Sequence, residues 1–190
     1  MVDLLFRVWS PIYDSAVFQK PFYRRVHARL MSALDGMEPR RVIDLGCGTA
    51  QLTADLAARF PASVVAGVDL SPDMLRAARR RLGGAAPALI NANVYALPFA
   101  DESIDLITNT ASYHWYVDYR RALAEIRRVM RPGGHFLLAT LTDTLFWKLM
   151  REVRIVSAAE TRADLEAAGF RVQRSERIRP WVTLFVAVRN

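Results

Sequence analysis

The chain has 190 residues, of which 52% are hydrophobic and 24% are charged, a composition typical of one ordinary folded domain. A chain of this length buries enough surface to fold without a disulfide or a structural metal. Its single cysteine, Cys47, cannot form a disulfide within the chain. No apolar run reaches the ~20 residues that span a bilayer, no stretch has the pattern of a cleavable leader, and no Cys/His spacing is typical of a metal site. These observations predict a cytoplasmic protein that holds no metal and contacts membranes at most peripherally.

The net charge is +7, from 26 basic and 19 acidic side chains, an excess that some nucleic-acid-binding proteins share. The basic residues are nevertheless spread along the whole chain rather than gathered in an arm. Their longest run, residues 79–81, falls at the end of a predicted helix, where cations stabilise the carbonyl end of the helix dipole. We therefore expect no nucleic-acid partner.

Residues 1–40 precede the first predicted strand and are expected to form a helical cap or lid, with the domain proper spanning residues 41–190. Phe22, Val26, Leu30 and Ala33 share one stripe of a predicted helix. The stretch before them, residues 4–13, is rich in aromatic and aliphatic side chains. Two interpretations stay open for it, namely packing against the sheet edge and a lid over a substrate.

From residue 41 onward, short apolar runs alternate with helical patterns, which is typical of a sheet built from strand–helix–strand units. Strands are predicted at residues 41–45, 63–70, 88–91, 104–109 and 136–141, and helices at 49–60, 71–83 and 118–131. Thr161, with Asp164 three residues later, is expected to begin a last helix, and the alternating runs at 170–178 and 181–188 predict a terminal antiparallel pair. Residues 142–156 are ambiguous, with a helix as the best interpretation. The pattern predicts one α/β domain.

The first strand runs into a glycine turn, Gly46-Cys47-Gly48, with a helix after it, an arrangement that lets a backbone approach a ligand closely. The dinucleotide-binding fingerprint requires a third glycine where this chain has Gln51. Asp44, two residues before the first glycine, would repel a pyrophosphate and attract an ammonium or sulfonium group. The turn therefore favours a cationic cofactor over a nicotinamide dinucleotide.

Asp69 ends the second predicted strand, 21 residues after Gly48. A carboxylate at this position can accept both hydrogen bonds from a ribose diol. The alternative role is capping of the following helix, for which Ser71 alone is sufficient. We therefore favour ribose binding for Asp69.

Four segments, in this order and spacing, resemble the class I S-adenosylmethionine-dependent methyltransferases, and in particular the type 11 group that includes quinone and phospholipid methyltransferases. They are VIDLGCGTA at 42–50, GVDLSPDML at 67–75, ALPFADESIDLI at 96–107 and AEIRRVMRPGGHF at 124–136. The resemblance implies a Rossmann-like, doubly wound sheet of seven strands in the order 3-2-1-4-5-7-6, mostly parallel with an antiparallel last strand. It also implies S-adenosyl-L-methionine as the cofactor.

The resemblance further implies roles for individual residues. Asp44 would serve the ammonium group of the cofactor directly or through water, and Asp69 would hold its ribose. Asn93 stands where the family usually has an acidic residue, and its amide oxygen can still accept from the adenine amino group. The implied cofactor-binding residues are Tyr13, Asp44, Gly46, Cys47, Gly48, Asp69, Leu70, Met74, Asn93, Val94 and Thr110.

Residues 110–116 follow the fourth predicted strand, at the edge where open α/β sheets bind their ligands. His114 in this segment is a candidate general base, and a hydrogen-bonded structural role for it stays open. The aromatic side chains around it favour a small apolar, aromatic or lipid-like acceptor. The predicted function is therefore methyl transfer, and the alternative is a non-catalytic methyltransferase-like binding module. The sequence leaves the oligomeric state undecided.

Overall fold

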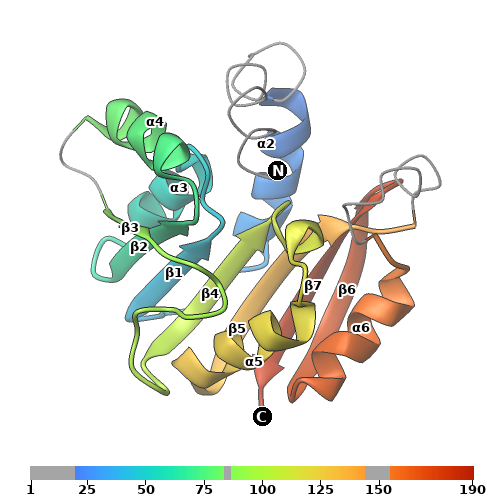
Figure 1. Ribbon diagram of the computed structural model, residues 1–190. Coiled ribbons are helices and arrows are strands. Elements are labelled where there is room, and N and C mark those ends of the chain that lie inside the picture. Colours follow the sequence, from blue (N-terminus) through green and yellow to red (C-terminus); the bar gives the residue numbers. More distant parts are fainter. Residues whose placement is uncertain (1–19, 84–86, 144–154) are drawn as a thin grey trace.

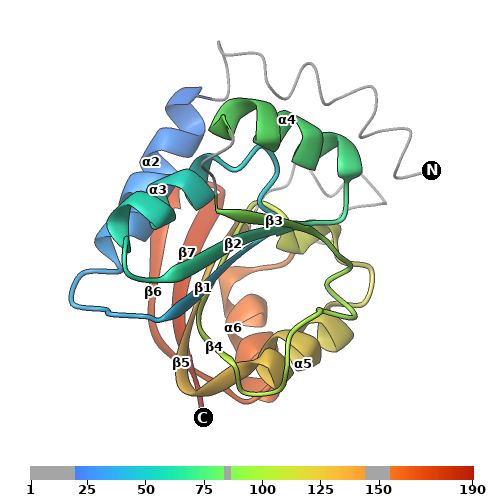
Figure 2. The ribbon, with the colours of Figure 1, turned by 90° about the vertical axis from the view of Figure 1, so that its left-hand side faces the viewer.

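A mixed sheet of seven strands organises the chain, as Figures 1 and 2 show for the computed structural model. The structure describes residues 20–83, 87–143 and 155–190. The predicted lid stretch with Tyr13, and most of the ambiguous segment 142–156, lie outside these residues. Within the described part, no helix combines the length and apolar character that crossing a bilayer requires.

The strand order is β3-β2-β1-β4-β5-β7-β6, which confirms the predicted order. Neighbouring strands are parallel from β3 through β5, and β7 is antiparallel to both of its neighbours, β5 and β6. The strands are β1 (Arg41–Leu45), β2 (Val64–Asp69), β3 (Ala88–Asn91), β4 (Ile104–Thr110), β5 (Met130–Leu141), β6 (Phe170–Arg179) and β7 (Val182–Arg189). The predicted doubly wound, Rossmann-like fold is therefore confirmed.

Helices cover both faces of the sheet (Figure 2). They are α2 (Lys20–Ser32), α3 (Gln51–Arg59), α4 (Pro72–Leu82), α5 (Tyr119–Val129), α6 (Ala158–Ala167) and the short 3-10 helix η1 (Tyr113–Trp115). Alternation along β1 separates two cores, because Val42 belongs to the core under α2 and α3, whereas Ile43 belongs to the core under α5 and α6.

The predicted apolar stripe of residues 1–40 is realised in α2. Val26 and Leu30 are fully buried there, as predicted. Ala33 follows the end of the helix and is half-buried, and the side chain of Phe22 lies outside the described residues. The described part of this segment therefore packs on the sheet.

Two predicted boundaries were wrong. The helix expected from Thr161 begins at Ala158, because Ser157 and Glu160 form a reciprocal capping box, and Thr161 is buried within its first turn. The strand expected from residue 136 begins at Met130. Met130 pairs with Ile104 and His135 with Leu106, so the Pro-Gly-Gly sequence forms a bulge inside β5 rather than a loop before it.

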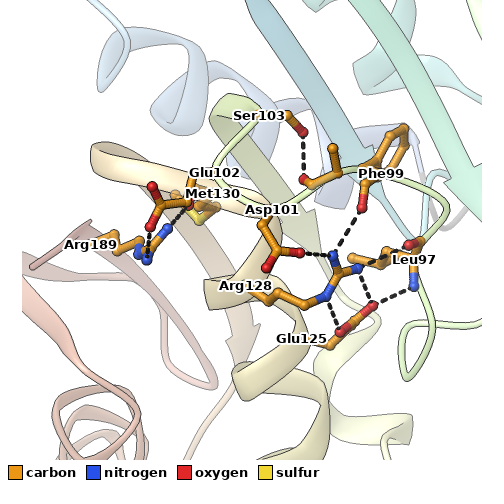
Figure 3. Close-up of polar contacts among 10 residues, drawn as sticks. Leu97, Phe99, Asp101, Glu102, Ser103, Glu125, Arg128, Met130 and Arg189 are labelled. Atoms are coloured by element: carbon orange, nitrogen blue, oxygen red, sulfur yellow. Dashed lines mark hydrogen bonds and ion pairs between the residues drawn. The ribbon is translucent and has the colours of Figure 1, made fainter.

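Arg128 on α5 fastens the loop between β3 and β4 to this helix (Figure 3). Its guanidinium donates to the carbonyl oxygens of Leu97 (3.1 Å) and Phe99 (3.0 Å). It also pairs with Asp101 at 2.6 Å and with both oxygens of Glu125 at 2.7 and 2.8 Å. Glu125 in turn accepts the backbone N–H of Leu97 at 2.7 Å. The loop that carries the predicted adenine-side residues is therefore held by one charged cluster.

We expect Arg128→Ala to lower the free energy of unfolding by about 1–3 kcal/mol, because two carbonyls and two carboxylates lose a charged donor. Solvent reaches the side chain, which is 34% exposed, and this places the effect in the lower part of that range. Urea denaturation followed by circular dichroism measures it. The matched control is Arg76→Ala, which removes an exposed helical arginine paired with Asp73 three residues earlier. Equal losses in the two variants would contradict the role of Arg128.

Candidate functional site

The glycine turn leaves β1 and crosses the carboxyl end of β2. The N–H groups of Gly46 and Cys47 donate to the carbonyl of Val68 at 2.7 and 3.1 Å. Gly46 has a φ of 72°, and a Cβ there would lie 2.3 Å from Ser112 Oγ, so the position requires glycine. A Cβ on Gly48 would meet nothing within 4 Å. The turn is therefore packed on one side and open on the other.

Asp44 lies beneath this turn and is only 2% exposed. Its Oδ2 accepts the hydroxyl of Thr53 at 2.6 Å, and its Oδ1 accepts the hydroxyl of Thr108 at 3.0 Å. Burial raises the pKa of the carboxyl to about 6, against the opposite effect of the two hydroxyls. At pH 7 most molecules therefore hold a buried negative charge at the centre of the sheet.

Asp69 ends β2 and joins the glycine turn to the start of α4. Its Oδ2 accepts the N–H of Gly48 and its Oδ1 accepts the N–H of Ser71, both at 2.8 Å. Burial raises the pKa of its carboxyl, and these two hydrogen bonds oppose that effect. Ser71 caps α4 by accepting from Met74 N, so Asp69 supports the start of the helix as well. Each carboxylate oxygen keeps a further lone pair, so ribose binding stays compatible with this role.

The predicted adenine-side residues differ in accessibility. Leu70 is 61% exposed, whereas Met74 and Val94 are buried at 6% and 8%. Asn93 is exposed, and its Oδ1 accepts the backbone N–H of Tyr95 at 3.0 Å. Leu70 and one lone pair of the Asn93 oxygen are therefore free to meet a ligand, while the other two side chains support the surface beneath.

Cys47 contributes its backbone to the turn, and its side chain packs elsewhere. The thiol is buried against β2, where a Cβ on Gly67 would lie 2.9 Å from it. Burial raises the pKa of this thiol above its usual range. A thiol in this environment stays protonated and is a poor nucleophile.

The segment after β4 carries the predicted acceptor-side residues. His114 lies in η1, is 5% exposed, and stacks at a tilt on Trp115 with ring centroids 5.2 Å apart. Burial lowers the pKa of His114 to about 4, so its imidazole is neutral at pH 7. Thr110 is half-buried, and its hydroxyl has no hydrogen-bond partner in the described structure.

A hydrogen-bond network that the sequence analysis missed fixes this segment to the glycine turn. The two N–H groups of Asn109 Nδ2 are shared among three acceptors, namely the carbonyl of Leu45 at 3.1 Å and Ser112 Oγ and Tyr116 Oη at 2.7 Å each. Ser112 is the residue that excludes a side chain at Gly46. The only sequence signal was an asparagine at the carboxyl end of a predicted strand.

The structure thus gathers the predicted site residues that it describes at one edge of the sheet, where β1, β2, β3 and β4 end, and Tyr13 lies outside the described residues. Hydrogen bonds link Asp69 to the glycine turn, and the Asn109 network links the turn to the segment with His114. Two carboxylates, Asp44 and Asp69, lie beside the glycine turn at this edge, and the aromatic segment with His114 lies next to them.

Comparisons with known proteins agree with this geometry. A model of the methyltransferase domain family matches residues 43–138, which is 96 of the 190 residues. The malonyl-[acyl-carrier protein] O-methyltransferase of Geobacter sulfurreducens is 35% identical over 167 residues, covering 78% of this chain and 62% of that protein. The demethylmenaquinone methyltransferase of Thermus thermophilus is 37% identical over 102 residues, covering 53% of this chain and 46% of that protein. The chain thus spans about half to three fifths of the length of these relatives.

Among solved structures, one similar chain comes from the complex between the Trm112 methyltransferase activator of Haloferax volcanii and a protein assigned as a methyltransferase. It matches with a TM-score of 0.80 at 22% identity, with 96% of both chains covered. At this identity the match shows a shared fold. The family model, which covers the glycine turn, Asp69 and the segment after β4, shows more: the chain belongs to the class I S-adenosylmethionine-dependent methyltransferases.

Proposed function

We propose that this chain transfers the methyl group of S-adenosyl-L-methionine to a small acceptor that binds beside residues 110–116. The observation that carries the proposal is the placement of two carboxylates, Asp44 and Asp69, around a glycine turn that is open at Gly48. A buried negative charge behind the turn attracts the ammonium and sulfonium groups of this cofactor and disfavours a pyrophosphate.

The residues present fit the cofactor. Asp69 keeps lone pairs for the ribose hydroxyls, the exposed Leu70 offers an apolar surface for the adenine, and the Asn93 oxygen can accept its amino group. Tyr13, which is expected to close over the cofactor, and the lid formed by residues 1–40 remain predictions. When bound, S-adenosyl-L-methionine supplies a methyl group on a positively charged sulfur, which is a good leaving group.

The contribution of the protein to such a displacement is mainly positioning. The Asn109 network holds the segment with His114 in a fixed relation to the glycine turn, and so sets the acceptor against the cofactor. Neutral His114 has a lone pair at pH 7 that can take a proton from a hydroxyl or carbon acid. Its low pKa makes it a weak base, so we assign it a rate contribution at the lower end of the range for general-base catalysis.

For the acceptor, we infer a small molecule with apolar or aromatic character, because Tyr113, Trp115 and Tyr116 surround His114 in the same segment. The names of the two relatives give a malonyl-carrier and a quinone acceptor, and both are tried in the experiment below. Cytoplasmic location and peripheral membrane contact stay predictions. The alternative function is a module that binds the cofactor without turnover.

The experiment that tests the function uses S-adenosyl-L-methionine with a labelled methyl group, incubated with the purified chain and either malonyl-acyl-carrier protein or demethylmenaquinone that dithionite keeps in its hydroquinone form. Fractionated lipid and aqueous extracts serve as a third, open pool of acceptors. Label in any of these products supports a methyltransferase, and label in a lipid-soluble product supports the apolar acceptor. Cofactor binding without label in any pool would favour the non-catalytic module.

Cofactor affinity should depend on pH through Asp44. Because the pKa of this carboxyl is about 6, lowering the pH from 7 to 5 protonates it and removes its attraction for the ammonium group. We expect the affinity for S-adenosyl-L-methionine to fall about tenfold over this range, as measured by titration calorimetry. Asp44→Asn should bind weakly at both pH values. If the variant retained the same pH dependence, another group would be responsible.

Asp69→Asn should weaken cofactor binding by about 1–3 kcal/mol, because the hydrogen bonds to the ribose lose their charge. The control is Asp73→Asn, which removes a carboxylate from the exposed first turn of α4. Thermal melts of both variants would verify folding. Full affinity in a folded Asp69→Asn protein would mean that Asp69 only joins Gly48 to Ser71.

His114→Ala should lower the turnover rate at saturating cofactor by about 10²-fold, the lower end for general-base catalysis, and leave cofactor affinity unchanged. The wild-type rate should show no titration of His114 between pH 6 and 8, because its pKa of about 4 keeps it neutral there. The matched control is His135→Ala, a half-buried histidine at the other end of the sheet. A loss of only a few fold would leave positioning as the sole contribution.

A further inference from the structure

Within the described residues, three buried polar atoms near the carboxyl ends of β4 and β5 lack a hydrogen-bond partner. They are Asn109 Oδ1, His114 Nδ1 and Thr140 Oγ1, in side chains that are 0%, 5% and 2% exposed. Buried polar groups in proteins are nearly always paired, and leaving one unpaired costs free energy. Three such atoms in neighbouring elements indicate a place where a further polar group binds.

The sheet register places Asn109 and Thr140 together, and a backbone hydrogen bond holds the segment with His114 beside them. Asn109 pairs with Leu138, and Thr140 lies two residues further along β5, so the two side chains are diagonal neighbours on the same face. The N–H of Ala111 donates to the carbonyl of Ala139 at 2.9 Å, which holds the start of the His114 segment against β5. Helix η1, part of the yellow segment that follows β4 in Figure 1, packs on β5.

The hydrogen-bonding capacity of the cluster defines its ligand. The amide nitrogen of Asn109 donates to the carbonyl of Leu45, which fixes the amide orientation and leaves an oxygen that can only accept. The hydroxyl of Thr140 can donate. Thr183 lies opposite Thr140 on β7, and its hydroxyl is hydrogen-bonded to that of Thr142 at 2.7 Å. These two hydroxyls extend the polar surface and leave the hydroxyl of Thr140 available to a ligand. A ligand must therefore donate to Asn109 Oδ1, and it can accept from the hydroxyl of Thr140.

We infer that Asn109, His114 and Thr140 form a subsite for a neutral hydroxyl group of the methyl acceptor, such as that of a phenol or an enol. A hydroxyl donates to Asn109 Oδ1 and accepts from Thr140, whereas a carboxylate has no proton for Asn109 and pays for its buried charge. The adjoining Tyr113 and Trp115 suit an aromatic or apolar remainder. The inference rests on the proposed function and specifies its class of acceptor.

The test uses three probes of similar shape, namely phenol, toluene and benzoate, each titrated into the protein saturated with S-adenosylhomocysteine. Nitrogen and proton NMR signals of the histidine rings report the binding, with no need for turnover. The chain has three histidines, and His27 on α2 and His135 on β5 act as internal references. The inference predicts that phenol shifts the signals of His114 selectively, and that toluene and benzoate bind at least about fivefold more weakly.

Thr140→Val removes the unpaired hydroxyl and keeps the shape of the side chain. Since that hydroxyl has no partner in the described structure, its removal should leave the melting temperature equal or higher. Phenol affinity should nevertheless fall about five- to tenfold. The control is Thr161→Val, whose buried hydroxyl donates to the carbonyl of Ser157 at 3.1 Å. That variant should melt at a lower temperature and bind phenol as the wild type does.

Equal binding of phenol and toluene, tighter binding of benzoate, or unchanged phenol affinity in Thr140→Val would each overturn the subsite. So would a lower melting temperature of Thr140→Val with unchanged phenol binding, because the hydroxyl would then be structural. These outcomes are separate from those of the labelled-methyl experiment. A methyltransferase with another acceptor site would pass the first experiment and fail this one.

Discussion

The buried carboxylate of Asp44 is the constraint around which the site is arranged. Desolvation disfavours a charge at this position, and two hydroxyls, from Thr53 on α3 and Thr108 on β4, offset part of that cost. Such an arrangement requires a central strand with a parallel neighbour on each side and a helix directly after it. The position of β1 between β2 and β4 supplies both. The charge is thereby held behind the glycine turn, where water cannot screen it.

From this centre, hydrogen bonds extend the rigidity of the sheet into the loops. Asp69 ties Gly48 to Ser71, and Asn109 ties the segment after β4 to Leu45. On the opposite side of the same loops, Arg128 holds the connection between β3 and β4 against α5 (Figure 3). Loops that are hydrogen-bonded to the sheet in this way hold their side chains in place before a ligand binds, which reduces the conformational entropy lost on binding.

The sequence predicted the strand order, the glycine turn and its two carboxylates, because each depends on local patterns and on a specific family resemblance. Prediction from the sequence failed where contacts between residues far apart in the chain determine the local structure. The start of β5 depends on pairing between Met130 and Ile104, and the orientation of Cys47 depends on its contact with Gly67. The capping box that begins α6 was visible as Ser157 and Glu160, but Thr161 offered a competing signal. The Asn109 network joins residues 109–116 to Leu45, which lies 64 residues earlier in the chain, and the asparagine at the strand end was too weak a signal to predict it.

Charge is divided across the site in a way that suits the proposed reaction. The cofactor side holds two carboxylates, whereas the segment beside it carries an imidazole that burial keeps neutral, together with unpaired amide and hydroxyl groups. A cationic methyl donor gains from the first environment, and a neutral nucleophile gains from the second. A carboxylate nucleophile would instead add a third buried negative charge near Asp44 and Asp69, at a Coulombic cost that low polarity increases. The same burial that raises the pKa of Asp44 therefore favours a neutral acceptor.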